Sequence, residues 1–150
     1  MLLRTHLMMA LFFGLLAMQY FGFGWLFLMV VLMATVIPDL DTSKSRFGKK
    51  FWILRPIQWI AGHRKIFHSL IFVLVFGIGL WFIFPFVVYG FVFGYVLHLL
   101  LDCFTIQGVM LFYPFSEWRI KGFVKTSGWI EWGIFLIGFL GVVWIVKKLI

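Results

Sequence analysis

Apolar positions dominate this chain and fall into five long runs that polar residues interrupt at few places. The runs cover residues 7–21, 23–37, 68–84, 86–104 and 129–145. Runs this long, with no regular polar face, predict helices surrounded by lipid rather than the amphipathic helices of a water-soluble core. We therefore predict an all-α fold, a polytopic membrane bundle of about five hydrophobic helices that forms a single domain over residues 1–150.

The first two runs are short and are separated by the turn Gly22-Phe23-Gly24. A helix of about 15 residues is only about 22 Å long, whereas the hydrocarbon core of a bilayer is about 30 Å thick. We therefore expect a tilted or re-entrant hairpin that returns the chain to its starting side. Pro38 is expected to end the second helix and to place Asp39 and Asp41 at its exit.

Composition supports a membrane location, because 64% of the residues are hydrophobic and only 12% are charged. The formal net charge is +8, and seven of the thirteen Lys and Arg lie between residues 44 and 65. These cations alternate with Trp, Phe and Ile, which is typical of a segment at the membrane surface. We expect the basic segment at about residues 43–65 to contact anionic lipid headgroups, and we do not expect nucleic acid as a partner.

The cations also predict an orientation. In a five-helix topology the N-terminus, the basic segment and the loop at 105–127 share one side and carry 11 of the 13 Lys and Arg. Only Lys147 and Lys148 lie on the other side. The positive-inside rule then places the N-terminus in the cytoplasm of a prokaryotic cell, with the C-terminus across the membrane.

His98 and Asp102 are the first chemical signal. They lie four residues apart, on one face of an otherwise apolar predicted helix. An ionisable side chain at the centre of a membrane helix costs roughly 2.5–3.5 kcal/mol on insertion, so such residues usually pair, bind an ion or line a transport path. A structural hydrogen bond between the two is the simpler alternative.

The predicted topology brings every histidine and carboxylate toward the same membrane face, and their nitrogen and oxygen atoms suit Zn²⁺ or Mn²⁺. His63 and His68 are about 500° apart on a helix, so one of them must precede it. Taken singly, the acids near Pro38 are also explained as a helix stop, and Glu131 as a charge that compensates the helix dipole. The candidate metal ligands are His6, Asp39, Asp41, His63, His68, His98 and Asp102.

Four motifs carry a resemblance to a known family. They are His6, Pro38-Asp39-Leu40-Asp41, Gly62-His63-Arg64 with Phe67-His68-Ser69, and Gly94 to Gly108 with His98, Asp102 and Thr105, followed by Tyr113-Pro114. In this order they resemble the YdjM-like family over about residues 6–116. The resemblance implies a membrane-bound, metal-dependent hydrolase.

The order His, Asp, His, His-x-x-x-Asp is more distantly similar to zinc-dependent phospholipase C and the P1-type nucleases, which are all-helical enzymes that hydrolyse phosphodiesters. Those enzymes take further ligands from histidines downstream, whereas no histidine follows His98 here. The resemblance therefore implies one or two ions, Zn²⁺ or Mn²⁺, rather than three.

The leading hypothesis is a hydrolase that cleaves a phosphoester of a phospholipid or lipid-linked substrate with metal-activated water. Asp39 and Glu131 are the candidate bases, and Arg64 is the candidate for neutralising charge on the phosphoryl oxygens. A carrier for protons or divalent metal is an alternative, as is a non-catalytic scaffold held together by a structural metal. The carrier requires polar groups across the whole membrane, and the other half of the chain offers only Gln19 and Tyr89.

Overall fold

The computed structural model describes residues 1–40 and 66–149. Within these ranges it contains helices and loops, with two isolated β-bridges and no strand, as the all-α prediction requires. Helices α5 and α6 are long and apolar enough to cross a membrane, and α2 and α4 are shorter apolar helices. The elements in order are α1 (Leu3–Phe21), α2 (Trp25–Leu40), α4 (Leu70–Ile83), α5 (Pro85–Cys103) and α6 (Trp129–Leu149).

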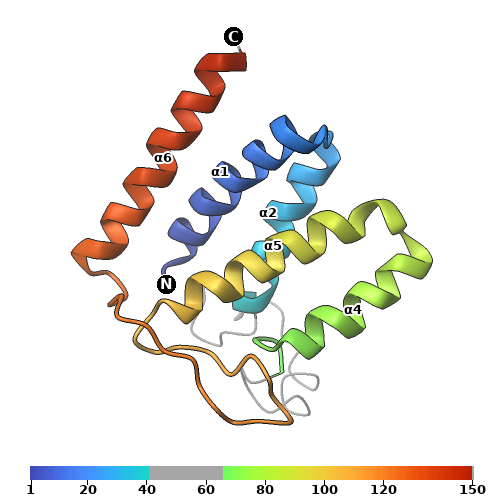
Figure 1. Ribbon diagram of the computed structural model, residues 1–150, viewed down its shortest axis with the longest axis vertical. Coiled ribbons are helices and arrows are strands. Elements are labelled where there is room, and N and C mark those ends of the chain that lie inside the picture. Colours follow the sequence, from blue (N-terminus) through green and yellow to red (C-terminus); the bar gives the residue numbers. More distant parts are fainter. Residues whose placement is uncertain (41–65, 150) are drawn as a thin grey trace.

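Two antiparallel hairpins form the body of the protein (Figure 1). In the first, α1 ends at Gly22, whose φ of 71° lies in the left-handed region that a glycine adopts without strain. In the second, Phe84 separates α4 from α5, and Pro85 occupies the first turn of α5, where its missing N–H has no helical partner to lose. Both turns lie where the sequence predicts them.

The two hairpins join where α2 lies against α5. Gly94 faces the backbone of α2 so closely that an added Cβ would overlap the carbonyl oxygen of Val31. Gly90 makes a similar approach one turn earlier, so the motif Gly90-x-x-x-Gly94 brings two helices together, as glycines at this spacing do in membrane proteins. The Thr35 hydroxyl shares its hydrogen between the carbonyl oxygen of Val31 on its own helix, at 2.8 Å, and that of Gly94 across the contact, at 3.2 Å.

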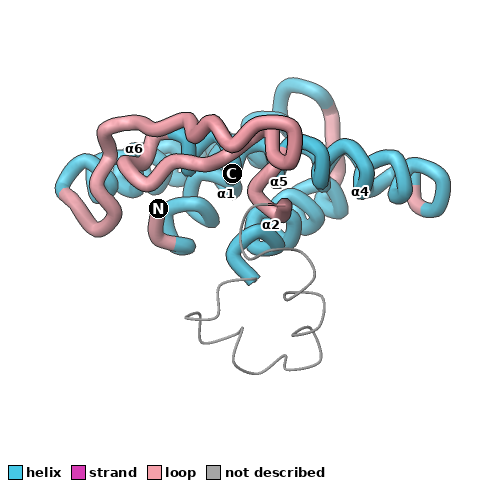
Figure 2. Tube along the Cα trace, turned by 90° about the horizontal axis from the view of Figure 1, so that it is seen from below, coloured by secondary structure: helices cyan, strands magenta, loops and turns pink. Residues whose placement is uncertain are grey.

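The last helix, α6, packs along α1, where Gly138 and Gly141 face Met9 and Phe12. Between α5 and α6 the chain forms a long loop that doubles back on itself, because Val109 and Ile120 pair through both backbone hydrogen bonds. The loop, the N-terminus and the site-bearing ends of α2, α4 and α5 lie at one end of the protein, and the C-terminus lies at the other (Figures 1 and 2).

Several predicted helix ends differ from the structure by a few residues. Helix α1 begins at Leu3 rather than Leu7, and α6 continues to Leu149 rather than Ile145. Helix α2 continues through the buried Pro38 to Leu40, so Asp39 lies in the last helical turn rather than beyond it. A proline near a helix end removes one N–H donor with little helix left to disrupt, which explains why the helix tolerates it. Helix α4 begins at Leu70 rather than His68, because the Ser69 hydroxyl caps it by accepting a hydrogen bond from Phe72 N–H.

Candidate metal centre

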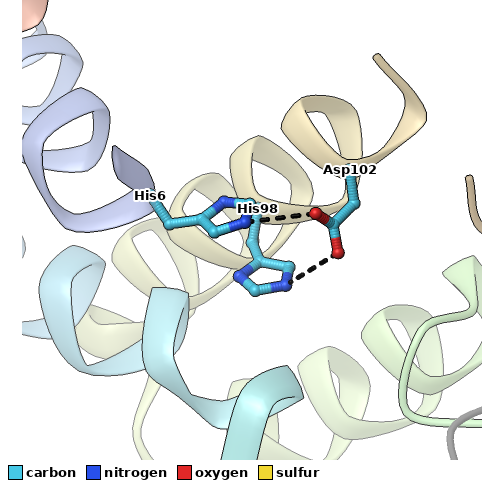
Figure 3. Close-up of side chains that lie close together, drawn as sticks. All are labelled: His6, His98 and Asp102. Atoms are coloured by element: carbon cyan, nitrogen blue, oxygen red, sulfur yellow. Dashed lines mark hydrogen bonds and ion pairs between the residues drawn. The ribbon is translucent and has the colours of Figure 1, made fainter. Parts of the chain in front are cut away.

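Asp102 is the centre of a cluster of histidines at the end of α5. Its Oδ1 lies 3.1 Å from Nε2 of His6, and its Oδ2 lies 3.5 Å from Nε2 of His98 (Figure 3). His68, just before α4, brings its Nε2 to 3.8 Å from Oδ2. Three imidazoles from three separate elements therefore surround one carboxylate. The N-terminal amine of Met1 also lies 2.8 Å from Oδ1.

A backbone carbonyl on the side of the ring away from Asp102 fixes the orientation of His98. Its Nδ1 lies 2.8 Å from the carbonyl oxygen of Thr35, and since a carbonyl only accepts, Nδ1 carries the proton. The lone pair of this fully buried ring is then on Nε2, which has no hydrogen-bond partner among the described residues. A histidine that donates one ring N–H to a carbonyl and presents the other nitrogen to a site has the usual arrangement of a metal ligand.

His6 lies directly over His98. The two rings are nearly parallel, with centroids 4.1 Å apart and 13° between their planes, and both side chains are fully buried. Nδ1 of His6 also has no hydrogen-bond partner among the described residues.

A second group of donors overlaps the first. The ligand atoms of Asp39, His68 and His98 lie within 4.8 Å of one another, and so do those of His6, His98 and Asp102. His98 belongs to both groups, but only its Nε2 lacks a hydrogen-bond partner among the described residues, so it could ligate only one ion. Asp102 turns one oxygen toward His6 and the other toward His98 and His68, which suits either a single ion or two ions that share this carboxylate.

The donor set fits a divalent metal. Imidazole nitrogens and carboxylate oxygens are ligands of Zn²⁺ and Mn²⁺, and three such protein ligands leave the fourth position of a tetrahedral Zn²⁺ site open to water or substrate. Two buried ring nitrogens that lack a hydrogen bond within the described residues are costly unless something else occupies them. The structure therefore brings together five of the seven predicted ligands: His6, Asp39, His68, His98 and Asp102.

Comparison with known proteins decides the family. A model of the YdjM inner membrane protein family matches residues 1–149. The chain belongs to this family. It is 35% identical to inner membrane protein YdjM of Escherichia coli strain K12 over 108 residues, which is 67% of this chain and 55% of that protein, and a Shigella flexneri protein of the same name matches equally. The chain thus spans about half the length of these curated relatives.

A second relative covers more of the chain. The uncharacterized protein YvsG of Bacillus subtilis strain 168 is 31% identical over 142 residues, which is 85% of this chain and 83% of that protein. No solved structure matches. Membership of the YdjM inner membrane protein family confirms the membrane location and the family resemblance, whereas the distant similarity to phospholipase C stays a prediction.

Not every predicted site residue of this YdjM family member joins the cluster. Asp41, His63 and Arg64 lie outside the described residues, so their predicted roles stay predictions. Glu131 is described and buried, but the structure does not bring it to the histidines. Its carboxylate accepts hydrogen bonds from the backbone N–H groups of Leu2 and Ser127 and from the Thr5 hydroxyl. Glu131 therefore ties the start of α1 to the start of α6, which supports a structural role, and its predicted role as a base stays a prediction.

Two supporting residues have only weak signals in the sequence. Thr35 lies one turn before Asp39 on α2, and its carbonyl orients His98. The Tyr95 hydroxyl, one turn before His98 on α5, donates to the carbonyl of Phe67 at 2.7 Å and so holds the segment that carries His68. A polar side chain one helical turn from a predicted ligand is the pattern that would have found both.

Proposed function

We propose that this member of the YdjM family is a membrane-embedded metal-dependent hydrolase that cleaves a phosphoester of a lipid or lipid-linked substrate at the cytoplasmic interface. One observation supports it most. Three histidines and two carboxylates from α1, α2, α5 and the segment before α4 converge at the end of the helices that also carries the long loop between α5 and α6. Metal ligands at this end of a membrane protein would be accessible both to lipid headgroups and to the water that hydrolysis consumes.

The ion would be held by His98 and Asp102, with His6 on one side and His68 and Asp39 on the other. A divalent ion bound there supplies Lewis-acid activation of water for attack on phosphorus and neutralises charge on the phosphoryl oxygens. Asp39 is also the remaining candidate base, because it is half-buried at the end of α2 beside His68 and His98, and a carboxylate that gives one oxygen to an ion keeps its second oxygen for a proton. It would accept the proton that water loses as the new oxygen–phosphorus bond forms, and the alcohol would leave as the ester bond breaks.

The cytoplasmic orientation rests on charge. Arg4, Arg119, Lys121 and Lys125 belong to the end of the protein that carries the cluster, and Lys147 and Lys148 belong to the opposite end (Figure 1). The excess of cations beside the cluster favours the cytoplasmic side of the membrane.

The decisive experiment measures metal and turnover on the same sample. Purified protein in detergent is expected to retain a stoichiometric divalent ion by elemental analysis and to release phosphate or a phosphorylated headgroup from lipid. His98→Ala is expected to lose both. Gln19→Ala, an exposed residue near the end of α1 far from the cluster, is the matched control and is expected to keep both. Turnover that persists in His98→Ala would exclude this mechanism.

The alternatives give different results in the same preparations. A structural metal predicts that chelation unfolds the protein and that no phospholipid is hydrolysed at any metal concentration. A carrier predicts uptake of the ion into proteoliposomes that contain the protein. The first of these outcomes would assign the cluster to stability and the second to transport.

A further inference from the structure

An apolar groove of about 530 Å³ lies between α4 and α5. Leu70, Leu74, Gly77 and Trp81 line it on α4, and Val88 and Val92 line it on α5. Each described residue that borders the groove is apolar or glycine. Apart from the indole N–H of Trp81, the described side chains of this surface carry no hydrogen-bonding group, so the groove suits a hydrocarbon ligand.

A glycine lies in the wall of the groove, among larger apolar side chains. Gly77 lacks a side chain where α4 approaches α5, and a Cβ added there would lie 3.5 Å from Cγ2 of Val92. Leu74 is 63% exposed and Trp81 is 50% exposed, so the described residues leave at least half of each side chain uncovered. These side chains leave a channel along the helix pair that lipid, rather than another part of the described chain, is free to fill.

The groove begins beside the metal centre. Leu70 follows His68 by two residues, and Nε2 of His68 lies 3.8 Å from Asp102. The start of α4 is held firmly there, because Ser69 caps the helix and the Leu70 N–H donates to the carbonyl of Leu111 at 2.8 Å. From Leu70 to Trp81 the helix rises about 16 Å, which is about half the hydrocarbon thickness of a bilayer. The groove thus runs from the cluster to about the depth that one acyl chain of one leaflet reaches.

We propose that this groove binds an acyl chain of a lipid whose phosphate lies at the metal centre. The inference rests on the proposed function and names the substrate class as an acylated phospholipid rather than a water-soluble phosphoester. A molecule that satisfies both regions needs an anionic oxygen-rich head for the cation and a straight hydrocarbon tail for the groove. A phospholipid has both, with the head and tail in this order along the membrane normal.

Two neighbouring residues provide a matched pair of variants. Leu74 lines the groove, whereas Val75 does not, and both are 63% exposed. Tryptophan at either position projects from an exposed face of α4. Because the two positions are equally exposed, we expect the two substitutions to have similar effects on folding. Leu74→Trp fills the groove and Val75→Trp leaves it open.

The experiment measures binding of didecanoyl phosphatidic acid to the metal-loaded protein by native mass spectrometry. Leu74→Trp is expected to weaken binding about tenfold, the effect of losing contact with about two methylene groups. Val75→Trp is expected to match the wild type. Glycerol 3-phosphate, which has the same phosphate but no tail, is expected to bind all three proteins alike. An acyl chain that carries a photoactivatable diazirine is expected to crosslink to α4 in the wild type and less in Leu74→Trp.

Several outcomes would overturn the proposal. Equal phosphatidic acid binding by the two tryptophan variants would show that the groove is not used. Equal binding of didecanoyl phosphatidylcholine and phosphatidic acid, unaffected by chelation, would show surrounding bilayer lipid only. These experiments measure lipid binding and not turnover. They therefore still test the groove if the His98→Ala experiment excludes the hydrolase mechanism. A difference between the two variants in that case would retain the groove as a lipid site without catalysis.

Discussion

The Nδ1–H of His98 donates to the carbonyl oxygen of Thr35 at 2.8 Å, and this bond turns the other nitrogen of the ring toward Asp102. The acceptor is on α2 and the histidine is on α5, so the contact between these two helices sets the geometry of the candidate metal centre. Anything that changes the spacing of α2 and α5 should therefore change metal binding, even where it touches no ligand.

Gly94→Ala is expected to disturb this spacing most. The new Cβ would overlap the carbonyl oxygen of Val31, so α2 and α5 must move apart, and overpacking of this kind destabilises by about 1–3 kcal/mol. Metal affinity is expected to fall about 10- to 100-fold as Thr35 withdraws from His98. Titration calorimetry and thermal unfolding in detergent would measure both effects. Gly79→Ala is the control, because no atom lies within 4 Å of a Cβ at that position, and a similar loss there would contradict the explanation.

Thr35→Val tests the same contact more gently. The substitution removes the hydroxyl that bonds to the carbonyls of Val31 and Gly94 but keeps the shape of the side chain and the backbone carbonyl that faces His98. We expect a loss of about 0.5–1.5 kcal/mol in the free energy of unfolding, which is the usual net value of one hydrogen bond. Thr35→Ser, which restores the hydroxyl, is expected to recover most of it in the same denaturation assay. No difference between the two variants would show that the hydroxyl does not hold the helices.

Asp102→Asn is expected to empty the centre. Asp102 is the carboxylate that faces His6, His68 and His98 together, so its charge serves every ion position in the cluster. If the wild type holds two ions, His6→Ala and Asp39→Asn should each leave one, whereas Asp102→Asn should leave none. Metal content per protein, measured by mass spectrometry after gel filtration, distinguishes these cases. Full retention of metal in Asp102→Asn would remove this residue from the ligand set.

Glu131→Gln is expected to weaken the attachment of α1 to α6 rather than the chemistry. The buried carboxylate accepts from two backbone N–H groups and the Thr5 hydroxyl, and an amide satisfies these donors poorly. The loss of charged hydrogen bonds predicts about 1–3 kcal/mol of destabilisation. Because Thr5 precedes His6, metal affinity should fall as well, while turnover per bound metal stays unchanged. A large fall in turnover per metal would instead restore Glu131 as a base.

The orientation predicts where the C-terminus lies. A reporter that fluoresces only in the cytoplasm, fused after Ile150, is expected to be dark, and alkaline phosphatase at the same position is expected to be active. A fusion in the loop at Glu117, at the end that carries the cluster, should give the reverse pattern. The opposite result at both positions would place the metal centre outside the cytoplasm.

Much of the fold follows from apolar runs and turn residues. The turn at Gly22 and the break at Pro85 lie where glycine and proline predict them, because each fixes the backbone locally. The continuation of α2 past Pro38 could not be predicted from the local sequence. Whether a proline ends a helix or occupies its last turn depends on the neighbours that bury it, and these come from distant parts of the chain.

The cluster was predictable as a set of residues but not as a geometry. His6, His68, His98 and Asp102 stand out because ionisable groups are rare and costly in apolar helices. The stacking of His6 on His98 and the carbonyl behind His98 depend on how α1, α2 and α5 pack. Glu131 had the same sequence signal as the ligands, and only its bonds to Leu2, Thr5 and Ser127 distinguish a structural acid from a functional one.

The donors of the cluster come from α1, the end of α2, the segment before α4 and the end of α5, and this distribution has a consequence for biogenesis. During synthesis the N-terminal hairpin emerges with His6 and Asp39 already in place, but it lacks His98 and Asp102 until α5 has been inserted. A cation bound by this cluster could be captured only after the second hairpin has docked against the first. Loading of such an ion would therefore report that the two hairpins have met in the membrane, and we expect nascent chains arrested before Leu97 to carry none.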